Sequence, residues 1–232
     1  MILPDYVRAQ TEKLAERYKP SQLKKLSSAL SDAYLNNKSD GARLVTTDEQ
    51  AVGYAAVRMP ATYAAVYSAL EAATGVESFS SMLDIGAGTG AAFFAAHEVT
   101  GVCDAVLVER EKAMITLARS FCEAGGLNAK IIKSDAADFA PDGKYDIVTA
   151  SYALNEMSKD TREKLLDKLL SATKKLLLIV ESGTTKAFSL QKEIRKYMAD
   201  KGAALIAPCP QNETCPLPET DWCHFTCRVE RS

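Results

Sequence analysis

Long apolar runs are missing from this sequence of 232 residues. The longest strongly apolar stretch is LLLIV at 176–180, whereas a helix needs about 20 apolar residues to cross a bilayer. The first ten residues, MILPDYVRAQ, also lack the basic start and apolar core of a secretory signal. We therefore expect no membrane partner and predict a soluble, cytoplasmic protein.

An excess of positive charge is missing too, because 28 lysines and arginines stand against 30 aspartates and glutamates. Such a chain binds nucleic acid only through a local basic patch, since its overall field is weakly negative. Histidine is scarce, with 2 residues, and no Ser-His-Asp or Cys-His set has a spacing that suggests nucleophilic catalysis. What remains is a globular chain, 47% hydrophobic, that can bury a sizeable core.

Helical patterns fill the first third of the chain. Residues 4–37 are typical of two short amphipathic helices. Thr47 opens a further helix with Gln50 as its capping-box partner, and Pro60 begins another. We predict an N-terminal helical region at 1–78.

From residue 81 onward, short apolar runs alternate with helical stretches. Runs this apolar, each followed by a helix, predict a parallel sheet covered on both faces. The expected parallel strands are 82–85, 105–109, 130–135, 145–150 and 174–181, and an antiparallel pair at 203–207 and 224–229 would close the sheet. The expected fold class is therefore α/β: a Rossmann-like, doubly wound, mostly parallel seven-stranded sheet over 79–232, with an N-terminal helical appendage and a C-terminal cysteine-rich segment at 207–227.

The first of these strands leads into a glycine loop, Gly86-Ala87-Gly88-Thr89-Gly90, and then into a helix. Glycine allows positive φ and lacks the Cβ that would keep a ligand away from the backbone. At the mouth of a doubly wound sheet this pattern predicts a nucleotide-type site. NAD stays open as the ligand, because Gly86, Gly88 and Ala91 satisfy the relaxed dinucleotide pattern G-x-G-x-x-A.

Acidic residues at the strand ends favour a different nucleotide. Asp84 precedes the glycines, Glu109 ends the second strand, where it can accept hydrogen bonds from both ribose hydroxyls, and Asp135 ends the third, where it can hold an adenine amino group. With the loop, these acids resemble class I S-adenosylmethionine (SAM)-dependent methyltransferases over 81–181. The resemblance implies cofactor binding by Asp84, Gly86, Ala87, Gly88, Gly90, Glu109, Asp135 and Ala136. For Asp84 or Asp146 alone, capping of a loop is an equal interpretation.

The stretch after the fourth strand lacks a catalytic signature. Many enzymes that methylate exocyclic base amines carry N/D-P-P-Y there, whereas this chain has SYALNE at 151–156. Asn155 or Glu156 could orient or deprotonate an acceptor near the methyl group. The alternative is a solvent-facing Glu156 and an Asn155 that caps the next turn.

Four of the 6 cysteines follow the spacing Cys209-x5-Cys215-x7-Cys223-x3-Cys227. In a reducing compartment clustered thiols favour metal ligands over disulfides, although this spacing matches neither the tight pair of common zinc modules nor a ferredoxin run. On a strand, Cys223 and Cys227 would lie about 13 Å apart at roughly 3.3 Å per residue. Cys227 is therefore the weakest ligand, and His224 could replace it. Four unrelated buried thiols are the other interpretation.

Three segments are more specific: RMPATYAAV at 58–66, LDIGAGTGAA at 83–92 and APCP…CPLPETDWCHF at 207–225. They resemble the small-ribosomal-subunit methyltransferase-like family, bacterial proteins related to a mitochondrial assembly factor of the small ribosomal subunit. The resemblance implies a class I methyltransferase core that acts in small-subunit rRNA methylation or subunit maturation. Arg58 and Tyr63 are expected to close over the methionine end of SAM, with a surface ion pair and core packing as their respective alternatives.

The same resemblance implies an iron–sulfur cluster, with zinc as the second choice. Cys209, Cys215 and Cys223 match the first three ligand positions of the family. Its fourth ligand lies beyond Ser232, so either Cys227 takes its place, the cluster is incomplete, or the chain is part of a longer protein.

The predicted function is SAM-dependent methylation of small-subunit rRNA, or a role in small-subunit maturation, with that rRNA as the partner. Three alternatives stay open: a catalytically silent assembly factor that binds SAM and rRNA, a small-molecule methyltransferase, and a dinucleotide oxidoreductase.

Overall fold

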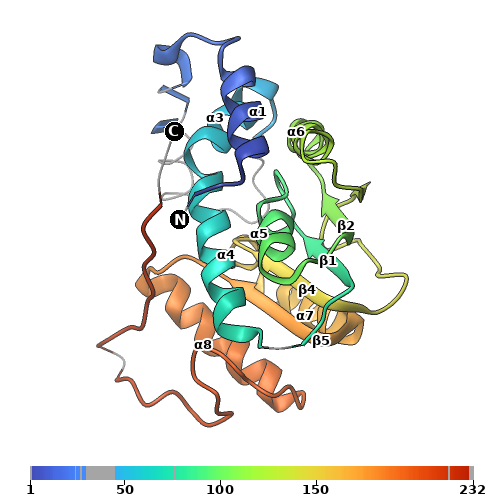
Figure 1. Cartoon of the computed structure of the whole chain (residues 1–232). Coiled ribbons are helices and arrows are strands. Elements are labelled where there is room, and N and C mark those ends of the chain that lie inside the picture. The colour runs from blue at the N-terminus through green and yellow to red at the C-terminus, as the bar shows by residue number, and fades with distance from the viewer. Residues whose placement is uncertain are drawn as a thin grey trace.

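A five-stranded parallel sheet forms the centre of the protein (Figure 1). The structure is a computed structural model and describes residues 2–23, 25–26, 28–29, 45–75, 77–218 and 220–229. The strand order is β3-β2-β1-β4-β5, and every neighbouring pair is parallel. The strands are β1 (Ser81–Ile85), β2 (Asp104–Glu109), β3 (Ala129–Lys133), β4 (Tyr145–Ser151) and β5 (Thr173–Val180). The order reverses between β1 and β4, which makes the sheet doubly wound and confirms the predicted α/β class.

Helices cover both faces of this sheet. On one side lie α4 (Met59–Ala73), α5 (Ala91–Thr100) and α6 (Lys112–Ala124), and on the other α7 (Lys159–Ala172) and α8 (Thr185–Asp200). Neighbouring strand residues point to opposite faces, so Met82 belongs to the first core and Leu83 to the second. Two buried faces explain why the strands are apolar without alternation.

The N-terminal helices pack on the first of these cores. In α1 (Asp5–Ala15), the Tyr6 ring meets Phe94 edge-on at 5.9 Å. It also covers Gly125, where a Cβ would come within 2.6 Å of the ring. In α3 (Asp48–Val57), the predicted capping box of Thr47 and Gln50 is confirmed.

Two N-terminal predictions are tested only in part. Pro60 lies in the first turn of α4, as predicted. The second predicted helix is helical at 20–23, 25–26 and 28–29, and the rest of it lies outside the described residues. The domain boundary after residue 78 stays a prediction.

The C-terminal segment corrects the predicted sheet, because 203–207 and 224–229 form no strands. The segment contains Pro208, Pro210, Pro216 and Pro218, which cannot donate to a strand ladder. Its backbone is held instead by side chains: Arg195 of α8 donates to the carbonyls of Cys209 and Gln211. The segment thus runs along the outside of α8 (Figure 1), and the sheet has five strands rather than seven. Within the described ranges, no helix is long and apolar enough to cross a membrane.

Candidate functional site

The glycine loop follows β1 at the carboxyl edge of the sheet. This is where the strand order reverses between the neighbouring strands β1 and β4. Gly86, Gly88 and Gly90 all have positive φ, at 70°, 56° and 88°. A Cβ on Gly86 would lie 3.1 Å from the Ala153 Cβ, and one on Gly90 would lie 3.2 Å from the Phe94 ring. A Cβ on Gly88 would meet nothing within 4 Å among the described atoms. An added Cβ at Gly86 or Gly90 would therefore be crowded as well as strained by the positive φ, whereas Gly88 borders open space.

Asp84 is buried directly below this loop, with 1% of its surface exposed. Its Oδ1 accepts a hydrogen bond from the Thr149 hydroxyl at 2.6 Å, whereas its Oδ2 has no partner in the described part of the chain. Burial, aided by the charge of Glu109 and opposed by the Thr149 bond, raises the pKa of Asp84 to about 7. The hydroxyl of Thr89, in the loop itself, is likewise buried and without a partner there. Buried polar atoms are normally hydrogen-bonded, so these two leave hydrogen-bonding capacity unused beside the loop.

Glu109 joins the end of β2 to the glycine loop. Its carboxylate accepts from the Gly88 amide at 2.9 Å and from the Glu111 amide at 2.7 Å. The side chain is buried, and burial raises its pKa. An ionised carboxylate offers about four acceptor positions, so Glu109 can hold the loop and still accept from a ligand hydroxyl.

Asp135 follows β3, next to the end of β2. It accepts from Arg110 at 3.2 Å and from the Ala137 amide at 3.0 Å. Arg110 also faces Glu111 at 3.5 Å, and its role in ordering this edge was not predicted. Ala136 is half-buried and packs towards the second core.

The chain after β4 takes an unusual turn. Tyr152 has a φ of 57°, and its amide donates to the Val180 carbonyl at 2.8 Å. A left-handed conformation costs roughly 1–2 kcal/mol for a residue other than glycine, and such strain is concentrated at functional sites. The turn leads into a 3-10 helix, η1 (Leu154–Glu156), which contains both predicted catalytic residues. Asn155 is exposed; Glu156 is half-buried, and burial raises its pKa against the opposing effect of Arg110.

Glu181, which follows β5, is a site residue that sequence reasoning missed. Its carboxylate accepts from the Leu154 amide at 3.0 Å, from the Asn155 amide at 3.3 Å and from the Asn155 side chain at 2.6 Å. Burial is the main cause that raises its pKa to about 7. The available signal was an acid after a parallel strand, at the same edge as Glu109 and Asp135.

Arg58 and Tyr63 were both predicted to close over a ligand. Their surroundings differ from each other in the structure. Arg58 is half-buried at the junction of α3 and α4, and its charge acts on Tyr54 and Tyr152. Tyr63 is 4% exposed and belongs to the first core, so core packing is the correct interpretation for it. Asp146 lies at the opposite edge of the sheet and accepts from the amide and hydroxyl of Ser80. It caps a loop.

The four clustered cysteines do not form the predicted metal site in this structure. The described residues contain no group of three or more His, Cys, Asp or Glu side chains that could hold a metal ion. Cys209 and Cys227 are exposed, whereas Cys215 and Cys223 are half-buried. The physical reason is that the segment follows α8 instead of turning back on itself as an antiparallel pair. As arranged, the residues do not fit a metal or a cluster.

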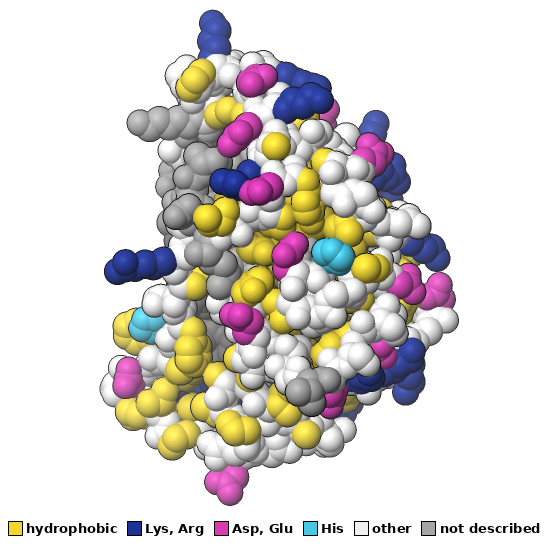
Figure 2. All heavy atoms as spheres, in the orientation of Figure 1, with side chains coloured by type: hydrophobic (Ala, Val, Ile, Leu, Met, Phe, Trp, Pro, Cys, Tyr) yellow, Lys and Arg dark blue, Asp and Glu magenta, His cyan; other side chains and the backbone are white. Residues whose placement is uncertain are grey.

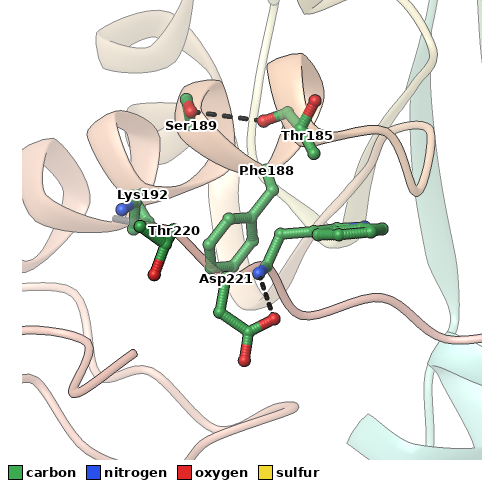
Figure 3. Close-up of a pocket in the computed structure, with 7 residues that line it drawn as sticks. Thr185, Phe188, Ser189, Lys192, Thr220 and Asp221 are labelled. Carbon is green, nitrogen blue, oxygen red and sulfur yellow. Dashed lines mark hydrogen bonds between the residues drawn. The ribbon is translucent and has the colours of Figure 1, made fainter. Parts of the chain in front are cut away.

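The segment is fixed at its far end by Trp222. The indole nitrogen donates to the Gly183 carbonyl at 3.2 Å, and the ring stacks on His224 at 5.5 Å. A small pocket lies between this segment and α8 (Figure 3). It is lined by Thr185, Phe188, Ser189, Lys192, Thr220, Asp221 and Trp222. No residue of the glycine loop lines it, so this pocket is not part of the glycine-loop site.

Comparison with solved structures finds complexes with SAH or SAM at low similarity. The plantazolicin methyltransferase BpumL in complex with SAH is 17% identical and has a TM-score of 0.49, covering 75% of this chain and 65% of that one. The DhpI-SAM-HEP complex is 22% identical, with a TM-score of 0.48 and coverage of 62% and 66%.

Comparison with curated proteins finds mitochondrial relatives. The chain is 25% identical over 222 residues to the human "Ribosome assembly protein METTL17, mitochondrial", which covers 87% of this chain and 49% of the human protein. It is 26% identical over 204 residues to the Schizosaccharomyces pombe "Rsm22-cox11 tandem protein 2, mitochondrial", with coverage of 77% and 27%. The chain thus spans half or less of the length of these relatives.

These relatives correct the predicted location. Because both carry mitochondrial names, the expectation of a cytoplasmic protein is contradicted. The family described as "Mitochondrial small ribosomal subunit Rsm22" matches residues 48–232, which is well over half of the chain. The chain therefore belongs to the Rsm22 family.

Proposed function

We propose that the carboxyl edge of the sheet binds SAM and that the protein is a SAM-dependent methyltransferase of small ribosomal subunit assembly, with small-subunit rRNA as its acceptor. One observation supports the cofactor above all. The buried Asp84 Oδ2 and Thr89 hydroxyl have no partner in the described part of the chain, and they adjoin a glycine loop whose middle glycine borders open space. This donor and acceptor set fits a polar nucleoside ligand.

Each residue of the edge has a role in the proposal. The backbone of the loop from Gly86 to Gly90 lies against the ligand at Gly88, Glu109 accepts from ribose hydroxyls, and Asp135 with Ala136 borders the adenine. Asp84 accepts from the amino acid part of SAM, and Arg58 closes over that end. When bound, SAM supplies an electrophilic methyl group. Asn155 and Glu156 then need only orient the acceptor, because positioning alone can supply much of the rate of a transfer step.

The ribosomal part of the proposal is supported by the family and by the printed name of the human relative, a ribosome assembly protein. On the face drawn in Figure 2, the described basic and acidic side chains are interspersed, so this face adds no support from charge. A catalytically silent assembly factor is the second candidate, favoured by the stretch SYALNE at 151–156 in place of N/D-P-P-Y. A small-molecule methyltransferase is the third.

Transfer of a radiolabelled methyl group from SAM to purified small ribosomal subunits separates these candidates. We expect label in the rRNA, and we expect Asn155→Ala to lower the incorporation. A protein that binds the particle and leaves no label would be a silent factor, and label in metabolites but not in RNA would identify the small-molecule enzyme.

The four C-terminal thiols stay a separate proposal, as ligands of an iron–sulfur cluster or of zinc. Metal binding would require the segment to leave α8 and fold around the ion, and binding free energy can drive such folding. We expect iron with sulfide, or zinc, after anaerobic purification, and loss of the metal in Cys209→Ser. A content below about a tenth of an equivalent would exclude the proposal, since structural sites bind tightly.

A further inference from the structure

We propose that Glu181 is a positioning residue, which holds the Asn155 side-chain amide so that its oxygen faces the acceptor. The catalytic consequence of this inference rests on the proposed function. The contact itself does not, so the two can fail separately.

The contact joins the ends of two neighbouring strands. Glu181 follows β5, and its carboxylate accepts three hydrogen bonds from the start of η1, which follows β4. The strained Tyr152 backbone is tied to β5 as well, through its amide and the Val180 carbonyl. The turn after β4 is therefore held at the mouth of the site by β5, and Glu181 supplies most of the bonds.

The chemistry of these bonds fixes the orientation of the amide. A carboxylate only accepts, so the group of Asn155 that meets Glu181 at 2.6 Å is its NH₂. The amide oxygen of Asn155 must then point away from Glu181. Because Asn155 is exposed, this oxygen is available as a hydrogen-bond acceptor.

An outward amide oxygen can accept a hydrogen bond from a methyl acceptor that carries N–H, such as an exocyclic base amine. Asn155 accepts one N–H and so directs the nitrogen lone pair towards the methyl group. The new N–C bond forms as the C–S bond breaks, its electron pair goes to sulfur, and the proton of the alkylated nitrogen leaves to water. This chain lacks the N/D-P-P-Y loop. In the proposal, the contact between Glu181 and Asn155 orients the acceptor nitrogen instead.

Protonation of Glu181 would disturb this arrangement. The ionisable groups that face it are Glu156 and Tyr152. Tyr152 is faced in turn by Tyr54, Arg58 and Cys227 of the C-terminal segment. Burial and the Glu156 charge favour the neutral form, and the three donors favour the carboxylate. In a neutral carboxyl group one oxygen carries a proton and donates a hydrogen bond. Fewer acceptor positions would then remain for the Asn155 NH₂ group.

The test is the ¹⁵N–¹H spectrum of the Asn155 side-chain NH₂ pair, identified by its loss in Asn155→Ala. We expect the wild-type pair to titrate with a midpoint near 7, as the pKa of Glu181 is about 7, and Glu181→Gln to abolish the titration. Glu163→Gln is the matched control, because Glu163 forms only a surface pair with Lys159 at 3.9 Å. In methyl transfer, Glu181→Gln should lower kcat by about 100-fold, as misplacement in a site can, with the KM for SAM unchanged.

An Asn155 pair that does not change in Glu181→Gln would overturn the inference. If that variant does not fold, a wild-type pair that shows no transition anywhere between about pH 4 and 9 would overturn it as well, because a contacting carboxyl must titrate somewhere in that range. If the pair titrates but SAH does not bind, the positioning contact stands and the proposed function fails.

Discussion

Gly88→Ala is expected to weaken SAH binding by at least about tenfold, which corresponds to 1.4 kcal/mol. The Cβ of alanine would enter the space bordered by Gly88, where no described protein atom lies within 4 Å. In our account that space belongs to the ligand, so the methyl group displaces it. Isothermal titration with SAH measures the change.

Gly101→Ala is the matched control for this substitution. Gly101 also has a positive φ, at 73°, and a Cβ there would meet nothing within 4 Å. Both variants therefore carry the same left-handed strain of roughly 1–2 kcal/mol, but Gly101 ends α5 and lies away from the loop. Equal losses of SAH affinity in both variants would mean that strain, and not occupation of a ligand site, explains the effect.

The second large effect concerns the buried carboxyl of Asp84. We expect the stability of Asp84→Asn relative to wild type to increase as pH rises from 4 to 8, by about 4 kcal/mol for a shift of three pKa units. The substitution should also abolish SAH binding, because the unpartnered oxygen is replaced by a donor.

The sign follows from the direction of the pKa shift. Burial raises the pKa of Asp84 from 3.8 to about 7 in the folded protein. Between these values the native state keeps a proton that the unfolded state releases, so rising pH favours unfolding and wild-type stability is lost. Asparagine does not titrate. An unpaired amide in Asp84→Asn lowers the free energy of unfolding by the same amount at every pH, so it does not affect the change with pH.

Urea unfolding of both proteins at several pH values measures this difference. Asp146→Asn serves as the control, because Asp146 lies at the opposite edge and both its partner bonds come from Ser80. If the stability difference for Asp84→Asn does not change with pH, the pKa of Asp84 is not raised in the folded protein. The buried, partly unpaired environment described for its carboxyl group would then be wrong.

The sheet and the glycine loop could be predicted because their signals are local. Doubly buried strands are apolar throughout, and the loop glycines are consecutive with the strand and helix that they join. The roles of Glu181 and Tyr152 could not be predicted in this way, even though Glu181 is an acid after a parallel strand, since these roles depend on hydrogen bonds between the ends of β4 and β5. Such a contact exists only after the strand order is known.

In the C-terminal segment, by contrast, local signals predicted strands that do not form. Short apolar runs such as AALIA at 203–207 fit a strand by composition, but the prolines that follow remove donors, and Arg195 offers the backbone a competing partner. Cysteine spacing failed for a related reason. Spacing along an extended chain does not determine which thiols meet, so neither the spacing nor the resemblance could show whether the four thiols come together.

The most direct test of the central claim is calorimetric titration of the wild-type protein with SAH and, separately, with NADH. The account predicts saturable binding of SAH with one site per chain, abolished by Asp84→Asn, and no binding of NADH. Binding of NADH in the absence of SAH binding would contradict it, because the acidic strand ends around Gly88 would then serve a dinucleotide.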